Sequence, residues 1–135
     1  MNIFVYGTLM HDEVTLALVG KKFRKTPAVL KGYFVSKIAN RAAPGMVVKK
    51  DTEARGFILS DVDEESIAVI DVWETNDYIA KQVIPKESKE ACSAYIWKGD
   101  ITGEPWSDEE YLNNHLQQYL ETDIPNFLKN YQKIS

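Results

Sequence analysis

The chain contains 135 residues, of which 44% are hydrophobic and 27% are charged, and these values suit one globular domain spanning residues 1–135 with a sizeable core. Its formal net charge is −4, and the sequence pI is near 5.2. A mildly acidic domain lacks the positively charged surface of nucleic-acid-binding proteins, so no nucleic-acid partner is expected.

Strand and helix signals alternate in the first half of the chain. Short segments rich in β-forming residues predict strands at residues 3–6, 28–38, 42–51 and 54–62. The second of these is interrupted by Gly32, and the third follows a turn at Pro44-Gly45. Residues 12–18 predict a helix, because acidic residues occupy its first turn and Gly20 follows its end.

The clearest helix of the chain is predicted in its second half, at residues 63–74 (DEESIAVIDVWE). Asp63 or Asp61 can cap this helix. Residues 78–85 and 91–99 then predict two paired strands, joined by the polar connection KESKE.

The C-terminal region predicts helices. Residues 107–120 begin with a capping box formed by Ser107 and Glu110, and a last short helix is expected from Pro125. The whole chain thus predicts about six strands and three or four helices. Because the strands dominate the middle, we expect an α+β fold with a mixed or barrel-like sheet rather than a doubly wound one.

Three absences indicate where the protein works. Cys92 is the only cysteine, so no intrachain disulfide is possible, which suits a reducing compartment. No basic region precedes a long apolar run at the N-terminus, and no apolar stretch approaches the length that spans a bilayer. We therefore expect a cytoplasmic protein without a membrane partner.

The run IFVYGTLM predicts a corner that can bind an anion. A strand that leads through Gly7 into a helix presents backbone N–H groups at its end, and these can hold a carboxylate or an oxyanion. The hydroxyls of Tyr6 and Thr8 add further donors. The alternative is an ordinary corner with Tyr6 in the core. The run is not a phosphate loop, because it has one glycine and no following Gly-Lys-Ser/Thr.

The helix at 63–74 carries a second unusual feature. Ile67, Ile70, Asp71 and Glu74 follow the spacing of a single helix face, and the two isoleucines indicate that this face points to the core. Both carboxylates then lie on the buried side or at its edge. The alternative is that they turn outward as the helix ends, or that Asp71 caps the following turn.

A glutamate at this position is a candidate acid or base. If Glu74 lies in a partly apolar pocket, we expect its pKa to be raised, which suits proton transfer near neutral pH. Trp73 can supply the apolar surface, and the Tyr78 hydroxyl can orient the carboxylate or a ligand.

Together these features resemble the γ-glutamylcyclotransferase-like family, most closely its AIG2-like and γ-glutamylamine cyclotransferase branch. The residues that carry the resemblance are VYGTLM, Gly32-Tyr33, Pro44-Gly45, Arg55-Gly56 and IDVWETNDY, and they cover the chain from residue 3 to about residue 97. The resemblance implies a small mixed β-barrel flanked by helices.

The resemblance also implies roles for individual residues. Substrate binding would fall on Tyr6, Gly7, Thr8 and Leu9, and Glu74 would be the proton acceptor. The partner would be a small γ-glutamyl compound, whose α-amine attacks its own γ-carbonyl to release 5-oxoproline and a free amine. The implied reaction needs no cofactor. The sequence leaves the identity of the leaving amine and the oligomeric state open.

Three positions depart from the family pattern. Thr75 follows the glutamate where glycine is common, and Lys81 stands where an arginine is common. Ala43 precedes Pro-Gly where an aromatic residue is frequent. The first two can alter the mouth of the substrate site, so these differences bear on the substrate more than on the chemistry.

Other chemistries are less well supported by the residues. His11 and His115 are the only histidines, and neither has a second metal ligand at helical spacing, so no metal site is expected. Serine and cysteine nucleophiles lack an identifiable histidine partner. Two alternatives stay open: a non-catalytic module that binds a small metabolite, and release of an amino-sugar or antibiotic from a γ-glutamyl protecting group.

Overall fold

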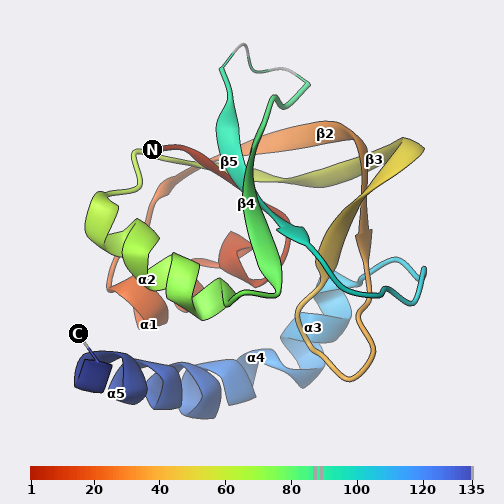
Figure 1. Ribbon diagram of the computed structural model, residues 1–135. Coiled ribbons are helices and arrows are strands. Elements are labelled where there is room, and N and C mark those ends of the chain that lie inside the picture. Colours follow the sequence, from red (N-terminus) through yellow and green to blue (C-terminus); the bar gives the residue numbers. More distant parts are fainter. Residues whose placement is uncertain (87, 89, 135) are drawn as a thin grey trace.

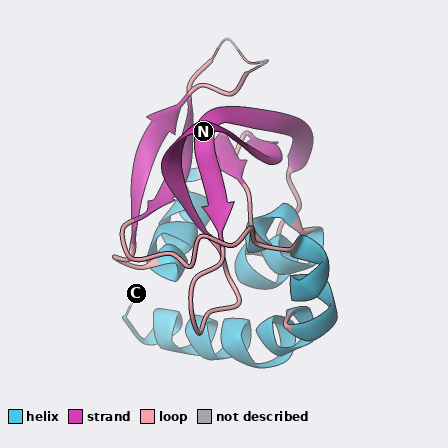
Figure 2. Cartoon of the chain, turned by 90° about the vertical axis from the view of Figure 1, so that its right-hand side faces the viewer, coloured by secondary structure: helices cyan, strands magenta, loops and turns pink. Residues whose placement is uncertain are grey.

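A computed structural model describes residues 1–86, 88 and 90–134, with the backbone alone for residues 132–134. In this part of the chain, five strands form one sheet in the order β2-β3-β1-β5-β4, and the helices gather on one side of it (Figure 1; Figure 2). The strands are β1 (Ile3–Val5), β2 (Arg24–Ser36), β3 (Gly45–Ser60), β4 (Tyr78–Val83) and β5 (Cys92–Trp97).

The expected α+β class is confirmed, and the expected sheet is corrected in detail. The sheet is mixed, because β1 pairs parallel with β5 while the other neighbouring strands are antiparallel. The strands of the described residues form an open sheet with β2 and β4 at its edges rather than a closed barrel. The strand pair expected at 78–85 and 91–99 is confirmed, and the connection between them includes residues 87 and 89, which lie outside the described residues.

The strand β1 is buried on both faces at the centre of the sheet. Ile3 and Val5 pack into a core cluster shared with the helices, while Phe4 packs into a second cluster within the sheet. The neighbours on the two sides are β3, where Leu59 faces Ile3, and β5, where Ser93 faces Ile3. Burial on both faces explains why this strand is apolar throughout.

The prediction of two strands at 42–51 and 54–62 is wrong, because β3 runs through both. Glu53 stays paired with Lys31 of β2, and pairing resumes at Val48 with Tyr33, so the polar residues 49–52 form an irregularity within one solvent-exposed hairpin. The hairpin of β2 and β3 is irregular at this point but continues beyond it. Asp51 adopts a φ of 65°, and the pairing register between the two strands shifts at Gly32. β2 also begins earlier than expected, at Arg24.

The helices are α1 (Asp12–Val19), α2 (Glu64–Glu74), α3 (Asp108–Asn114), α4 (Leu116–Gln118) and α5 (Ile124–Ile134). The cap at Asp63 is confirmed, because its carboxylate accepts the N–H of Ser66 at 3.1 Å. The capping box expected at Ser107 and Glu110 is half formed among the described residues: the Ser107 hydroxyl accepts the N–H of Glu110 at 3.1 Å, while the Glu110 carboxylate contacts Lys37. Gly20 ends α1 with a left-handed φ of 73°. Among the described residues, no helix combines the length and the apolar character needed to cross a bilayer.

The C-terminal helical region differs from the single helix expected at residues 107–120. The helix breaks at His115, and a π-helical turn over Tyr119–Asp123 precedes α5. Pro125 explains this wider turn, because it has no N–H to donate and its ring excludes the carbonyl one turn earlier. The expected last helix is confirmed, and it begins at Ile124.

Gly56 provides a test of the packing around β1. A Cβ atom at this position would lie 2.1 Å from the carbonyl oxygen of Val5, which is backbone and cannot move aside. We expect Gly56→Ala to lower the free energy of unfolding by roughly 3 kcal/mol in thermal or urea unfolding followed by circular dichroism. The exposed neighbour Arg55 provides the control, and Arg55→Ala should leave stability nearly unchanged. Equal stability of the two variants would contradict this packing.

Candidate active site

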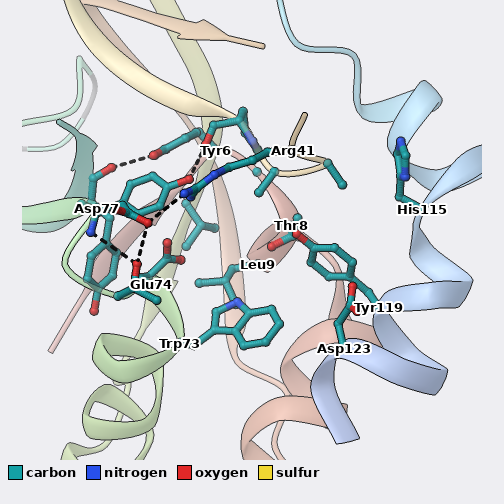
Figure 3. A pocket seen from close by; sticks show the side chains of 18 of the residues that line it. Tyr6, Thr8, Leu9, Arg41, Trp73, Glu74, Asp77, His115, Tyr119 and Asp123 are labelled. Atoms are coloured by element: carbon teal, nitrogen blue, oxygen red, sulfur yellow. Dashed lines mark hydrogen bonds and ion pairs between the residues drawn. The ribbon is translucent and has the colours of Figure 1, made fainter. Parts of the chain in front are cut away.

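A cavity of about 810 Å³ opens beside the end of β1. Its walls come from four segments, residues 4–9, 40–44, 73–78 and 115–123, together with Tyr95. All the residues expected to form the site, from the N-terminal corner and from the end of α2, line this single cavity. The C-terminal helices form the opposite wall (Figure 3).

The corner at Tyr6–Leu9 is shaped by close contact with a neighbouring loop. A Cβ atom on Gly7 would lie 2.8 Å from the Cδ and Cγ atoms of Pro44, so only glycine permits this approach. Thr8 and Leu9 are buried, and no hydrogen bond joins the N–H groups of Gly7, Thr8 or Leu9 to another residue of the described part of the chain. Buried N–H groups normally have partners, so this corner is suited to a ligand.

Two expectations for this corner need correction. The strand does not lead directly into a helix: a 3₁₀ turn at Thr8–Met10 intervenes, and α1 begins only at Asp12. The positive end of α1 therefore does not add to the corner, which relies on its own N–H groups. The Tyr6 side chain packs in the core, and its hydroxyl donates to the carbonyl of Tyr95 at 2.6 Å.

Glu74 is the last residue of α2 and lies at the wall of the cavity. The spacing predicts this helix face correctly for Ile70, which is fully buried, and for Glu74, which is partly buried beside it, but not for Asp71, which turns outward. Burial in the cavity wall, with a smaller contribution from the negative charge of Asp71, raises the pKa of Glu74 to about 8. Asp71 itself is exposed and accepts a hydrogen bond from the Tyr95 hydroxyl.

Two aromatic residues support this end of α2. Trp73 lines the cavity next to Glu74 and packs edge-on against Tyr119, with ring centroids 5.8 Å apart. Tyr78 also lines the cavity, but its hydroxyl donates to the carbonyl of Pro44 at 2.8 Å instead of to the Glu74 carboxylate. Tyr78 therefore holds the neighbouring loop in place, and burial followed by the charge of Glu74 raises its pKa.

The sequence interpretation missed a charged pair at the cavity rim. An Nη atom of Arg41 donates to Asp77 Oδ2 at 2.9 Å, and the Thr75 hydroxyl donates to the same oxygen at 3.1 Å. The hydrogen bond from Arg41 is the main reason that the pKa of Asp77 is lowered. Of the three positions that depart from the family pattern, Thr75 and Ala43 line the cavity and Lys81 does not.

Thr75 has a backbone conformation that explains one of these departures. Its φ is 62°, a left-handed value that favours glycine, which is the residue common at this position in the family that the sequence resembles. Its hydroxyl also accepts the N–H of Asp77 at 3.3 Å, which stabilises the turn locally. The sequence signal for this turn is the run of turn-forming residues directly after Glu74, which ends at Asp77.

The C-terminal wall was also missed. His115, Gln118, Tyr119 and Asp123 line the cavity, although nothing local in their sequence marks them as site residues. Within the described residues, no three side chains of histidine, cysteine, aspartate or glutamate form a group that could hold a metal ion.

Comparisons with known proteins identify the family and the fold. Residues 3–115 match the model of the family described as "Gamma-glutamyl cyclotransferase, AIG2-like". The chain is 29% identical over 129 residues to Protein AIG2 C of Arabidopsis thaliana, covering 90% of this chain and 78% of that protein.

The similarity extends to solved structures. A solution structure of an Arabidopsis thaliana protein has a TM-score of 0.68 and 26% identity, covering 96% of this chain and 83% of that one. A structure described as a γ-glutamyl cyclotransferase has a TM-score of 0.54 and 12% identity, covering 96% of this chain and 98% of that one, which shows likeness of fold alone. The family match includes the corner, the end of α2 and the loop at 40–44, and it ends at His115.

The raised pKa of Glu74 predicts how stability depends on pH. The carboxyl titrates near 4.5 in the unfolded chain and near 8 in the folded protein, so between these values the folded state holds a proton that the unfolded state has lost. Stability from this group is complete below pH 4.5 and is lost as pH rises through 8. We expect Glu74→Gln to remove this dependence, so that the variant is more stable than wild type at pH 9 by roughly 4 kcal/mol but not at pH 4.5.

Urea unfolding at pH 4.5, 7 and 9 measures this difference. Glu65→Gln is the matched control, because Glu65 lies exposed on the same helix. A stability difference between wild type and Glu74→Gln that stays constant over this pH range would mean that Glu74 has an ordinary pKa.

Proposed function

The chain belongs to the AIG2-like γ-glutamyl cyclotransferase family, and we propose that it catalyses the cyclisation of a γ-glutamyl amine or γ-glutamyl peptide, releasing 5-oxoproline and a free amine. One observation carries the proposal. The Glu74 carboxyl, with its pKa raised to about 8, shares a cavity with the unpaired N–H groups of the Gly7–Leu9 corner. A base and a set of oxygen-binding donors are the two elements that this reaction requires.

The proposed reaction balances without a cofactor. The α-amine nitrogen of the substrate attacks its own γ-carbonyl carbon, a carbon–nitrogen bond forms, and a five-membered ring closes. The bond from that carbon to the leaving nitrogen then breaks. Glu74 takes the proton that the attacking nitrogen loses as the ring closes and returns it to the leaving nitrogen, so the carboxylate ends in its original state. An amine that arrives as an ammonium loses one proton more before attack, and the released amine takes up that proton.

The pKa of Glu74 suits this proton transfer. An α-amine has a pKa of about 8, so it is largely protonated at neutral pH and cannot attack until a base removes a proton. A carboxylate with an ordinary pKa is too weak a base to do this efficiently. A carboxylate with a pKa of about 8 accepts the proton at nearly equal energy, which is favourable for catalysis.

The cavity supplies the remaining requirements. The N–H groups of the Gly7–Leu9 corner would hold substrate oxygens, either the α-carboxylate or the oxyanion that develops on the γ-carbonyl. Folding the substrate so that its amine meets its carbonyl contributes several kcal/mol more. The wall formed by Trp73 and Tyr119 leaves an apolar, partly open surface for the leaving amine.

The first experiment measures 5-oxoproline release from a panel of γ-glutamyl amines and γ-glutamyl dipeptides. We expect wild type to turn over at least one of them and Glu74→Gln to lower kcat by about a thousandfold, because the general base is lost. Glu65→Gln should be as active as wild type. If wild type yields no product but still binds the panel, the protein is a metabolite-binding module on the same fold.

The pH dependence of turnover provides a second test. Only the deprotonated carboxylate can act as the base, so kcat/KM should rise with pH, reach half of its maximum near pH 8 and level off above that value. Asp71→Asn should move this rise to lower pH, because the charge of Asp71 contributes to the raised pKa of Glu74. A rise that is unmoved in Asp71→Asn would assign the titration to the substrate amine instead of Glu74.

A further inference from the structure

We propose that Arg41 binds the α-carboxylate of the γ-glutamyl group, which leaves the N–H groups of the Gly7–Leu9 corner for the γ-carbonyl oxyanion. This inference rests on the proposed function, because it takes the α-amine of the substrate to be held by Glu74. It assigns the α-carboxylate to Arg41 and the γ-carbonyl oxyanion to the Gly7–Leu9 corner. A good substrate must then have a free α-carboxylate.

The covalent structure of the substrate places the carboxylate near Glu74. The α-amine and the α-carboxylate are attached to the same carbon atom, so an amine held at Glu74 puts the carboxylate only a few ångströms away. The cavity wall also contains the carboxylates of Asp77 and Asp123, and a further anion there needs a cation. Among the described residues that line the cavity, Arg41 is the only lysine or arginine.

Arg41 is connected to the end of α2 through Asp77. Figure 3 shows Arg41 bound to Asp77 at the cavity, and Arg41 is also near enough to Tyr78 and Tyr119 for its charge to lower the pKa of each hydroxyl against the effect of burial. The turn that follows α2 links Glu74 to Arg41, because Asp77 anchors Arg41 and is only three residues after Glu74. The base and the cation are therefore positioned by one short turn.

The guanidinium of Arg41 is held in place while most of its donors stay available. One Nη atom contacts Asp77 at 2.9 Å, and the guanidinium carbon lies 4.8 Å from the centroid of the Trp97 ring. Arginine has five N–H donors, and in the described part of the chain only this one hydrogen bond is formed by its side chain. The side chain is 43% exposed, which suits a residue that receives a ligand at the cavity rim.

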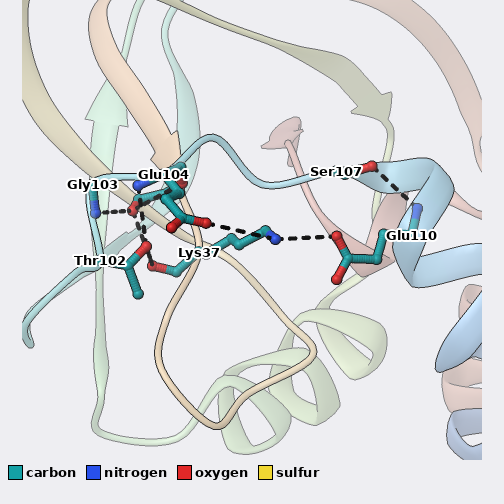
Figure 4. Close-up of polar contacts among 7 residues, drawn as sticks. Lys37, Thr102, Gly103, Glu104, Ser107 and Glu110 are labelled. Atoms are coloured by element: carbon teal, nitrogen blue, oxygen red, sulfur yellow. Dashed lines mark hydrogen bonds and ion pairs between the residues drawn. The ribbon is translucent and has the colours of Figure 1, made fainter.

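The loop that carries Arg41 is fixed at several points. The N–H of Lys37 donates to the carbonyl of Glu104 at 2.8 Å, and the Lys37 side chain also contacts Glu110 of α3 at 3.1 Å (Figure 4). The Trp106 indole donates to the carbonyl of Ala42 at 2.9 Å.

On the other side of Arg41, the Tyr78 hydroxyl holds the carbonyl of Pro44. These contacts keep the backbone on both sides of Arg41 in place before a ligand arrives. Such preorganisation is what a carboxylate-binding arginine requires, because little freedom is then lost on binding. Asp77 and Tyr78 are thus positioning residues for Arg41.

The reaction product provides a direct test. 5-Oxoproline carries the carboxylate, and 2-pyrrolidinone is the same ring without it. By calorimetry or NMR titration, we expect Arg41→Gln to weaken 5-oxoproline binding about ten- to a hundredfold and to leave 2-pyrrolidinone binding unchanged. Arg24→Gln, which removes an exposed arginine outside the cavity, should bind both compounds as wild type does. Arg41→Lys should recover part of the lost affinity, because it restores the charge but not the planar fork.

Measuring turnover of three substrates shows whether Arg41 binds the α-carboxylate or a carboxylate on the leaving group. γ-Glutamylglycine and γ-glutamylmethylamine share the α-carboxylate, whereas 4-aminobutanoylmethylamide lacks it. Arg41→Gln should lower kcat/KM for the first two about equally and leave the slow reaction of the third unchanged.

The inference is overturned if wild type does not bind 5-oxoproline, if Arg41→Gln weakens both ring compounds alike, or if it affects γ-glutamylglycine alone. The last result would assign Arg41 to the leaving group. If no substrate is turned over but 5-oxoproline binding still depends on Arg41, the carboxylate site stands and the proposed cyclisation fails. Circular dichroism of each variant confirms that the fold is intact.

Discussion

The burial of β1 on both faces is the interaction on which the rest of the site depends. This three-residue strand lies between β3 and β5, and its side chains enter two separate core clusters. Its end is therefore fixed, and the Gly7–Leu9 corner follows at once. The buried strand holds the corner against Pro44, at a distance from Gly7 that only glycine allows. The unpaired N–H groups of the corner therefore lie at the cavity wall. A more exposed or mobile strand could not keep these donors without partners.

Desolvation gives the cavity its chemical character. The same burial that raises the pKa of Glu74 also raises the pKa values of the surrounding tyrosines, so their hydroxyls stay protonated. Three of these hydroxyls have structural partners: Tyr6 donates to Tyr95, Tyr78 to Pro44, and Tyr95 to Asp71. The tyrosines therefore build the walls, and Glu74 is the carboxyl in the cavity lining whose pKa burial raises.

The two sides of the cavity differ in their relation to the family. The side with Glu74, the Gly7–Leu9 corner and Arg41 lies within residues 3–115, the part that matches the family model. On the other side, Gln118, Tyr119 and Asp123 belong to a segment beyond that match. The C-terminal segment is held on the domain by His11 Nε2, 2.7 Å from Asp108 Oδ1, and by Trp73 against Tyr119.

The sequence by itself determined most local structure and the two motifs of the site. Helix caps at Asp63 and Ser107, the core-facing side of α2 and the anion-binding potential of the corner all depend on residues a few positions apart, so local patterns reveal them. The continuity of β3, the pairing of Arg41 with Asp77 and the wall made by Tyr119 and Asp123 depend on segments that meet only when the chain folds. The pKa of Glu74 belongs to the same class, because burial exists only in the folded protein. Tertiary structure therefore decided which charged groups face the substrate, since desolvation and long-range charge pairing have no local signature in the sequence.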